Sequence, residues 1–85
     1  MDTKEIGQLR RQLDDLDEKL VALLNERANL ALTIAVQKED QNLPRYDPER
    51  EEQIFAHIQD ISSGPLIGAP LRDIYETILR VMKEL

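Results

Sequence analysis

Three cationic residues in the first half of the chain have types and spacing that could bind an anion: Arg10, Arg27 and Lys38. Arg27 stands where a run of apolar residues at three- and four-residue spacing would place a leucine. It is eleven residues before Lys38, which in an α-helix is three turns plus about 20°, so both side chains project from nearly the same face. Taken singly, each has a structural alternative: Arg27 as a partner of Glu26 or Glu51, and Lys38 as a solvated residue near a helix end.

Arg10 is too far along the helix to join them in one chain. It precedes Arg27 by seventeen residues, which is roughly 25 Å of helical rise and about 100° of rotation. Two long helices paired antiparallel would place Arg10 of one chain near Arg27 and Lys38 of the other, and a two-fold axis would make two equivalent sites. The alternative is that Arg10 is an ordinary surface charge.

A second polar cluster, Asp47-Pro48-Glu49-Arg50-Glu51, has the features of a helix start. Asp is a favoured N-cap, Pro is favoured at the first helical position, and acids suit the positive end of the helix dipole. Asp47 shares a face with Arg50 and Glu51. Because the first turn also presents free backbone N–H groups, such a terminus can hold a small polar ligand as well as cap itself.

The element expected to carry the first three cations is one long helix at about residues 4–41. Apolar residues recur there at heptad spacing and form a seam: Ile6, Leu9, Leu13, Leu16, Leu20, Leu23, Leu30 and Ile34. No Pro interrupts the stretch, which would be well over 50 Å long. Since such a helix is too long for a compact monomer of 85 residues, we expect a homodimer.

Two shorter helices are expected at about 48–62 and 70–85, separated by Ser62-Ser63-Gly64-Pro65 and preceded by a break at Pro44. Their apolar stripes step by three and four. These are Ile54, Phe55, Ile58 and Ile61 in one helix, and Leu71, Ile74, Tyr75, Ile78, Leu79, Met82 and Leu85 in the other. No strand-like alternation occurs, so the sequence predicts an all-α fold, with residues 1–85 as a single domain of three helices.

Composition narrows the classes of partner and location. A net charge of −6 argues against nucleic acid, which would favour a basic face. The chain has no Cys and only one His, His57, which argues against a thiolate or zinc site. No apolar run is long enough to span a membrane, and residues 1–5 lack the apolar core of a signal peptide. We therefore expect a cytoplasmic protein with no metal.

The ordered set Leu-Asn-Glu-Arg at 24–27, Lys38 and Arg-Tyr-Asp-Pro-Glu-Arg-Glu at 45–51 resembles the all-helical, AroQ-type chorismate mutases, and the likeness covers essentially the whole chain. The resemblance implies an intertwined dimer whose long first helices pair, and in which each of two sites takes one arginine from the partner. It also implies an isomerase of the shikimate pathway that converts chorismate to prephenate for phenylalanine and tyrosine synthesis. No cofactor is implied, because the rearrangement is pericyclic and forms no bond to the protein.

The resemblance also implies a role for each matching position. The two carboxylates of chorismate would be bound by arginines, the ether oxygen by a lysine, and the ring hydroxyl by a carboxylate together with nearby backbone. In this sequence those residues are Arg10 of the partner chain, Arg27 and Arg50 for the carboxylates, Lys38 for the ether oxygen and one carboxylate, and Glu51 with the backbone near Asp47 for the hydroxyl.

The third helix departs from the family's pattern at two positions. Met82 stands where a small residue, often Ser, contributes to carboxylate binding, and the family's Gln or Glu for the ether oxygen would fall one residue beyond Leu85. Two explanations are open. The chain is a domain of a longer polypeptide, as in members fused to prephenate dehydratase or to the first synthase of the pathway, or it is an altered catalyst. Core packing is the alternative role for Met82.

Two other functions stay open beside the mutase. One is isochorismate pyruvate lyase, which shares the fold and similar cationic groups. The other is a helical dimerisation or regulatory module with little activity, which the missing Gln position would suit. The Asn-Glu-Arg and Asp-Pro-Glu-Arg-Glu segments favour the mutase.

Overall fold

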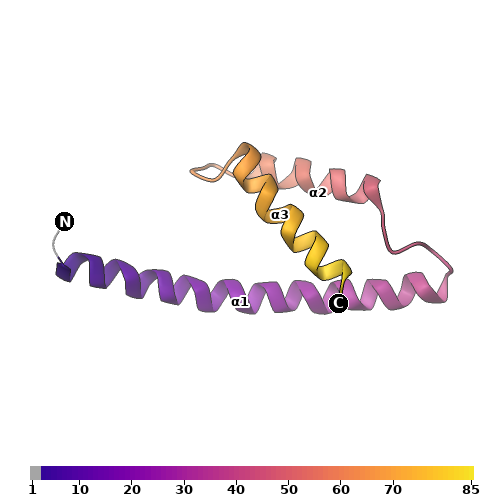
Figure 1. The fold of residues 1–85 in the computed structure, drawn as a ribbon, viewed down its shortest axis with the longest axis horizontal. Coiled ribbons are helices and arrows are strands. Elements are labelled where there is room, and N and C mark those ends of the chain that lie inside the picture. The colour runs from indigo at the N-terminus through magenta and orange to yellow at the C-terminus, as the bar shows by residue number, and fades with distance from the viewer. Residues whose placement is uncertain (1–2) are drawn as a thin grey trace. The chain divides into compact units, whose positions relative to one another are not determined.

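The computed structural model describes residues 3–85 as three α-helices joined by two connections without strands: α1 (Thr3–Asp40), α2 (Pro48–Ile61) and α3 (Gly68–Lys83) (Figure 1). This confirms the all-α class with three helices and a long first one. The helix bounds lie within two residues of those expected. Met1 and Asp2, which belong to the stretch weighed as a signal peptide, lie outside the described residues.

Helix α1 is 38 residues long, or about 57 Å at 1.5 Å per residue. Glu5 in its first turn and Lys38 in its last turn both complement the helix dipole. The chain forms two compact units, one ending at Leu30 and the other being Ala31–Leu85, and α1 runs through the boundary between them. The expectation of a single domain over residues 1–85 stays a prediction.

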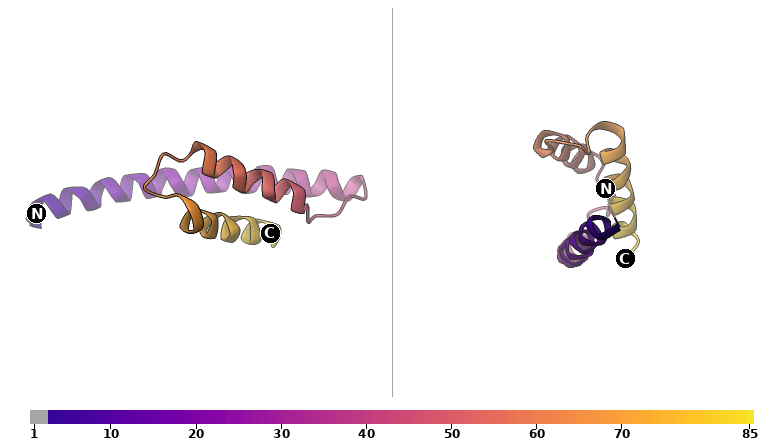
Figure 2. Two further views of the ribbon diagram at one scale, coloured as in Figure 1. Left: turned by 90° about the horizontal axis from the view of Figure 1, so that it is seen from above. Right: turned by 90° about the vertical axis from the view of Figure 1, so that its left-hand side faces the viewer.

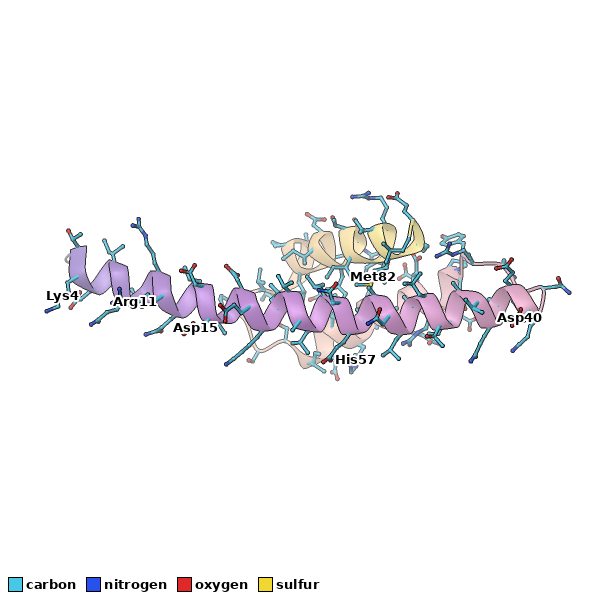
Figure 3. All side chains as sticks on the ribbon, turned by 90° about the horizontal axis from the view of Figure 1, so that it is seen from below. Lys4, Arg11, Asp15, Asp40, His57 and Met82 are labelled. Carbon is cyan, nitrogen blue, oxygen red and sulfur yellow. The ribbon has the colours of Figure 1, made fainter. Side chains whose placement is uncertain are left out.

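None of the described residues of α1 is buried, and its side chains project on all sides of the helix (Figure 3). Most of the apolar seam is exposed, with Leu20 at 54%, Leu23 at 59% and Leu30 at 66%, whereas Ile6 is half-buried. Leu9, Leu13, Leu16 and Ile34 are exposed as well. A helix normally buries its apolar stripe, and contiguous apolar surface of this kind marks an interaction site.

Helix α2 begins as the sequence predicts. Asp47 is the N-cap, and its Oδ1 accepts a hydrogen bond from the backbone N–H of Arg50 at 3.1 Å. Pro48 occupies the first turn, where its missing N–H costs nothing. The helix ends at Ile61, after which Ser62 donates through its hydroxyl to the carbonyl of Leu66.

Helix α3 begins at Gly68, two residues earlier than expected, because a side chain of α2 holds that residue. The amide of Gln59 donates to the Gly68 carbonyl at 2.7 Å and accepts from the Gly68 N–H at 2.8 Å. Gly68 has a φ of 64°, a conformation that glycine adopts without steric cost. The contact joins the end of α2 to the start of α3 and fixes the connection between them.

Helices α2 and α3 lie side by side, and the core of the Ala31–Leu85 unit lies between them (Figures 1 and 2). The buried residues of this cluster are Phe55, Ile58, Leu71 and Leu79, with Ile54 and Tyr75 packed around them. Three residues of the predicted stripes are exposed in the single chain: Ile61 at 64%, Ile74 at 44% and Leu85 at 52%. The stripes read from periodicity are therefore wider than the face that α2 and α3 bury against each other.

Arg72 of α3 covers one side of this core. Its guanidinium carbon lies 4.0 Å from the centre of the Phe55 ring, and it forms ion pairs with Glu76 at 3.0 Å and Glu52 at 3.2 Å. The hydrogen bonds with Glu76 and then Glu52 raise the pKa of Arg72, so the group stays charged. Across residues 3–85, no helix combines the length and the apolar character needed to cross a membrane.

Candidate active site

The predicted site residues of α1 fall in both units of the chain. Arg10 is exposed and Arg27 is half-buried, and both precede Leu30. Lys38 is half-buried in the last turn of α1 and belongs to the Ala31–Leu85 unit. Both residues belong to α1, which runs from Thr3 to Asp40. The same-face relation expected of Arg27 and Lys38 from their eleven-residue spacing stays a prediction.

The connection from α1 to α2 holds the Lys38 side chain. The chain turns after α1 with Asn42 at a φ of 58°, and the Leu43 N–H donates to the Lys38 carbonyl at 2.7 Å. The Lys38 ammonium in turn donates to the carbonyl of Arg45 at 3.4 Å. An ammonium has three donors, so this contact leaves two for other acceptors.

The first turn of α2 presents Arg50 and Glu51 next to this connection. The Arg50 side chain is exposed and donates to Gln53 at 3.4 Å, which uses one of its five N–H donors. Asp47 is engaged in capping through its side chain, and its carbonyl accepts from the Glu51 N–H at 3.1 Å. The sequence therefore predicted both the cap and the position of these residues correctly.

The partner of Glu51 is a residue that the sequence did not indicate. Lys83, 32 residues later in the last turn of α3, places its ammonium 2.7 Å from Glu51 Oε2. The same ammonium lies 4.7 Å from the centre of the Tyr46 ring. The signal that could have found it is topological: a short connection returns α3 along α2, so the last turn of one helix reaches the first turn of the other.

Met82 is buried, with 8% of its surface exposed, and lies on α3 (Figure 3). Burial suits the packing alternative for this residue, and its role at a substrate carboxylate stays a prediction. Arg45, next to the Lys38 contact, donates to the carbonyl of Leu85 at 3.2 Å. The end of α3 is thus tied to the same connection that holds Lys38.

The structure brings four of the predicted site residues into one region of the Ala31–Leu85 unit: Lys38, Asp47, Arg50 and Glu51. Arg10 and Arg27 belong to the other unit. A shallow hollow on that unit is lined by Asp14, Asp17, Glu18 and Val21, and its negative charge does not suit an anionic ligand. The cationic residues, together with one half-buried carboxylate, offer donors for an anion and an acceptor for a hydroxyl.

A family model for chorismate mutase type II matches residues 9–85 of the chain. Among curated proteins, the chain is 39% identical over 80 residues to the bifunctional chorismate mutase/prephenate dehydratase of Aquifex aeolicus. That match covers 89% of the chain but only 22% of the relative's length. The chain therefore spans about a fifth of that relative.

Two solved structures are similar over nearly their whole length. Form II of the chorismate mutase from Thermus thermophilus is 30% identical with a TM-score of 0.93, and the match covers 95% of this chain and 92% of that one. The chorismate mutase from Helicobacter pylori, solved in complex with prephenate, is 31% identical with a TM-score of 0.88 and covers 95% and 88%.

Proposed function

Because the chain belongs to the chorismate mutase type II family, we propose that it is an isomerase that converts chorismate to prephenate in phenylalanine and tyrosine biosynthesis. The observation that carries the proposal is the placement of Lys38 against the connection that leads into the first turn of α2, where Arg50 and Glu51 lie. These residues belong to the ordered set through which the sequence resembles the family, and they supply both donors and an acceptor.

The reaction breaks a C–O bond while a C–C bond forms, and no bond to the protein is needed. The chain's contribution is to hold the enolpyruvyl side chain folded over the ring. The substrate then loses its conformational entropy on binding, offset by binding energy, and not on reaching the transition state. Lys38 would place its remaining donors at the ether oxygen, which becomes more negative as the C–O bond lengthens. Charge stabilised at that oxygen lowers the barrier.

Arginines would bind the two carboxylates of the substrate. Arg50 is exposed and has several guanidinium donors. Arg27 would share a helix face with Lys38, as their eleven-residue spacing predicts. Glu51, with the backbone near Asp47, would accept a hydrogen bond from the ring hydroxyl of chorismate. This contact would determine which face of the ring the enolpyruvyl side chain folds over. Met82 would border a carboxylate at a position where the family more often has a small residue.

The third arginine, Arg10, would come from a second copy of the chain. The exposed seam of α1 supports this, since a 38-residue helix without a buried residue could cover its apolar stripe by pairing with a second copy. Antiparallel pairing of two α1 helices offsets the 25 Å or so of rise between Arg10 and Arg27. The result would be an intertwined homodimer with two shared sites.

The product, prephenate, could be consumed by a second enzyme fused to the mutase. The A. aeolicus relative is named as a mutase joined to a prephenate dehydratase. A similar fusion here, like the cytoplasmic location expected from the sequence, stays a prediction.

The test is an assay of purified protein with chorismate and, separately, isochorismate. We expect chorismate absorbance to fall as prephenate forms, and isochorismate to be unchanged. Release of pyruvate from isochorismate would support the lyase. No turnover of either substrate by a folded protein would instead favour a dimerisation or regulatory module.

A further inference from the structure

We propose that Lys83 is a positioning residue for this reaction: it holds the carboxylate of Glu51 in the orientation that accepts the ring hydroxyl of the substrate. The inference rests on the proposed function and adds to it a residue that neither the motif order nor the predicted cationic set contains. It starts from the Lys83–Glu51 contact between the last turn of α3 and the first turn of α2.

The Lys83–Glu51 ion pair differs from the surface pairs of the same two helices. Its atoms are 2.7 Å apart, whereas the pairs formed by Arg72 and Arg80 measure 3.0 to 3.6 Å. The Glu51 side chain is 21% exposed, whereas the carboxylates of those other pairs are 51% to 69% exposed. Water therefore screens this pair less, and the contact holds Glu51 in one geometry more firmly than an exposed pair would.

Lys83 is itself held in place from two directions. A cation in the last turn of α3 is favoured by the helix dipole, as an anion is in the first turn of α2. The ammonium also lies 4.7 Å from the centre of the Tyr46 ring, within the range of a cation–π contact. Tyr46 immediately precedes the Asp47 cap, so the residues that start α2 fix the position of Lys83.

Fixing one oxygen of Glu51 leaves the other to act on a ligand. The last torsion of a glutamate side chain is broad, so without a partner the plane of the carboxylate rotates. Lys83 binds Oε2, and a carboxylate has two oxygens with several acceptor positions. A plane set by Lys83 gives the ring hydroxyl an acceptor of defined direction. Since that hydrogen bond forms with the substrate and persists in the transition state, it acts mainly on binding.

The experiment is steady-state kinetics of Lys83→Met, with circular dichroism to establish that the helices form. We expect kcat/KM for chorismate to fall about tenfold, mostly through a higher KM, because a hydrogen bond to a charged acceptor is weakened. Lys83→Arg, which keeps the cation, should recover part of the loss. Arg80→Met removes an exposed pair of the same helix and should have wild-type kinetics.

A double-mutant cycle with Glu51→Gln decides whether Lys83 acts through Glu51. If it does, Lys83→Met should have almost no further effect on kcat/KM in the Glu51→Gln background. Wild-type kinetics of Lys83→Met would overturn the inference, and so would an equal loss in both backgrounds. If Lys83→Met does not fold, the cycle is run with Lys83→Gln. A wild-type protein without turnover would overturn the proposed function itself, which is a separate result.

Discussion

Arg27 is a charged residue at a position where the three- and four-residue spacing of the seam would place a leucine. The residue as a whole is half-buried, and a planar guanidinium can bind a carboxylate through two parallel hydrogen bonds. We predict that Arg27→Ala lowers kcat/KM for chorismate by at least about a hundredfold, because charge-assisted hydrogen bonds to a carboxylate are lost. Substrate depletion by the purified variant measures the loss.

The matched control is Arg11→Ala, which removes an exposed arginine from the same helix and should leave kcat/KM unchanged. Both variants should have the oligomeric state of the wild-type protein by sedimentation. Wild-type activity of Arg27→Ala would show that the proposed carboxylate contacts are misplaced.

At this scale the sequence predicted residues better than it predicted pairs. The Asp47 cap is local, because its donor is three residues away, and it was found from residue types alone. Glu51 was predicted as a site residue, which stays a prediction, and the sequence did not indicate its contact with Lys83. Lys83 is 32 residues distant, and the contact depends on how α3 returns along α2. Contacts of that kind follow from packing, which periodicity does not encode.

At the scale of elements, two glycines should respond to alanine in opposite directions. Gly7 lies inside α1, where a new Cβ would meet only the Arg11 guanidinium at 3.9 Å, so Gly7→Ala should stabilise the protein by about 0.5–1 kcal/mol. Gly68 has a φ of 64°, and Gly68→Ala should destabilise by about 1–2 kcal/mol although the space is open. Urea unfolding measures both, and shifts of the same sign would contradict the argument.

Element boundaries show the same division between local and tertiary causes. Pro44 and the Asp47-Pro48 pair are strong local signals, and α2 starts where they indicate. The start of α3 at Gly68 could not be predicted, because it depends on both ends of the Gln59 amide, nine residues earlier. The Ile67 at its N-cap makes no side-chain hydrogen bond, so no capping residue marks the boundary in the sequence.

At the scale of the whole molecule, a shared site predicts that two inactive variants restore each other. In a mixed dimer of Arg10→Ala with Arg27→Ala, one site lacks both arginines and the other has both. Equal amounts unfolded and refolded together should therefore give about a quarter of wild-type activity, because half of the dimers are mixed and each has one intact site. Chorismate turnover of the mixture measures it.

The control is each variant refolded alone, which should have almost no activity. If the mixture is no more active than the single variants, Arg10 does not act across a dimer. A second control replaces Arg10→Ala by Arg11→Ala in the mixture. Its activity should come only from sites whose Arg27 is supplied by the Arg11→Ala chain.

The exposed seam of α1 affects what fraction of the synthesised protein is active in a cell. Under the proposed pairing, a helix with no buried residue is stabilised by association, and its apparent stability rises with protomer concentration. While most chains are unpaired, the population of active sites would increase as the square of the amount synthesised. Expression level would then set flux in a steeply non-linear way, and dilution alone would switch the catalyst off.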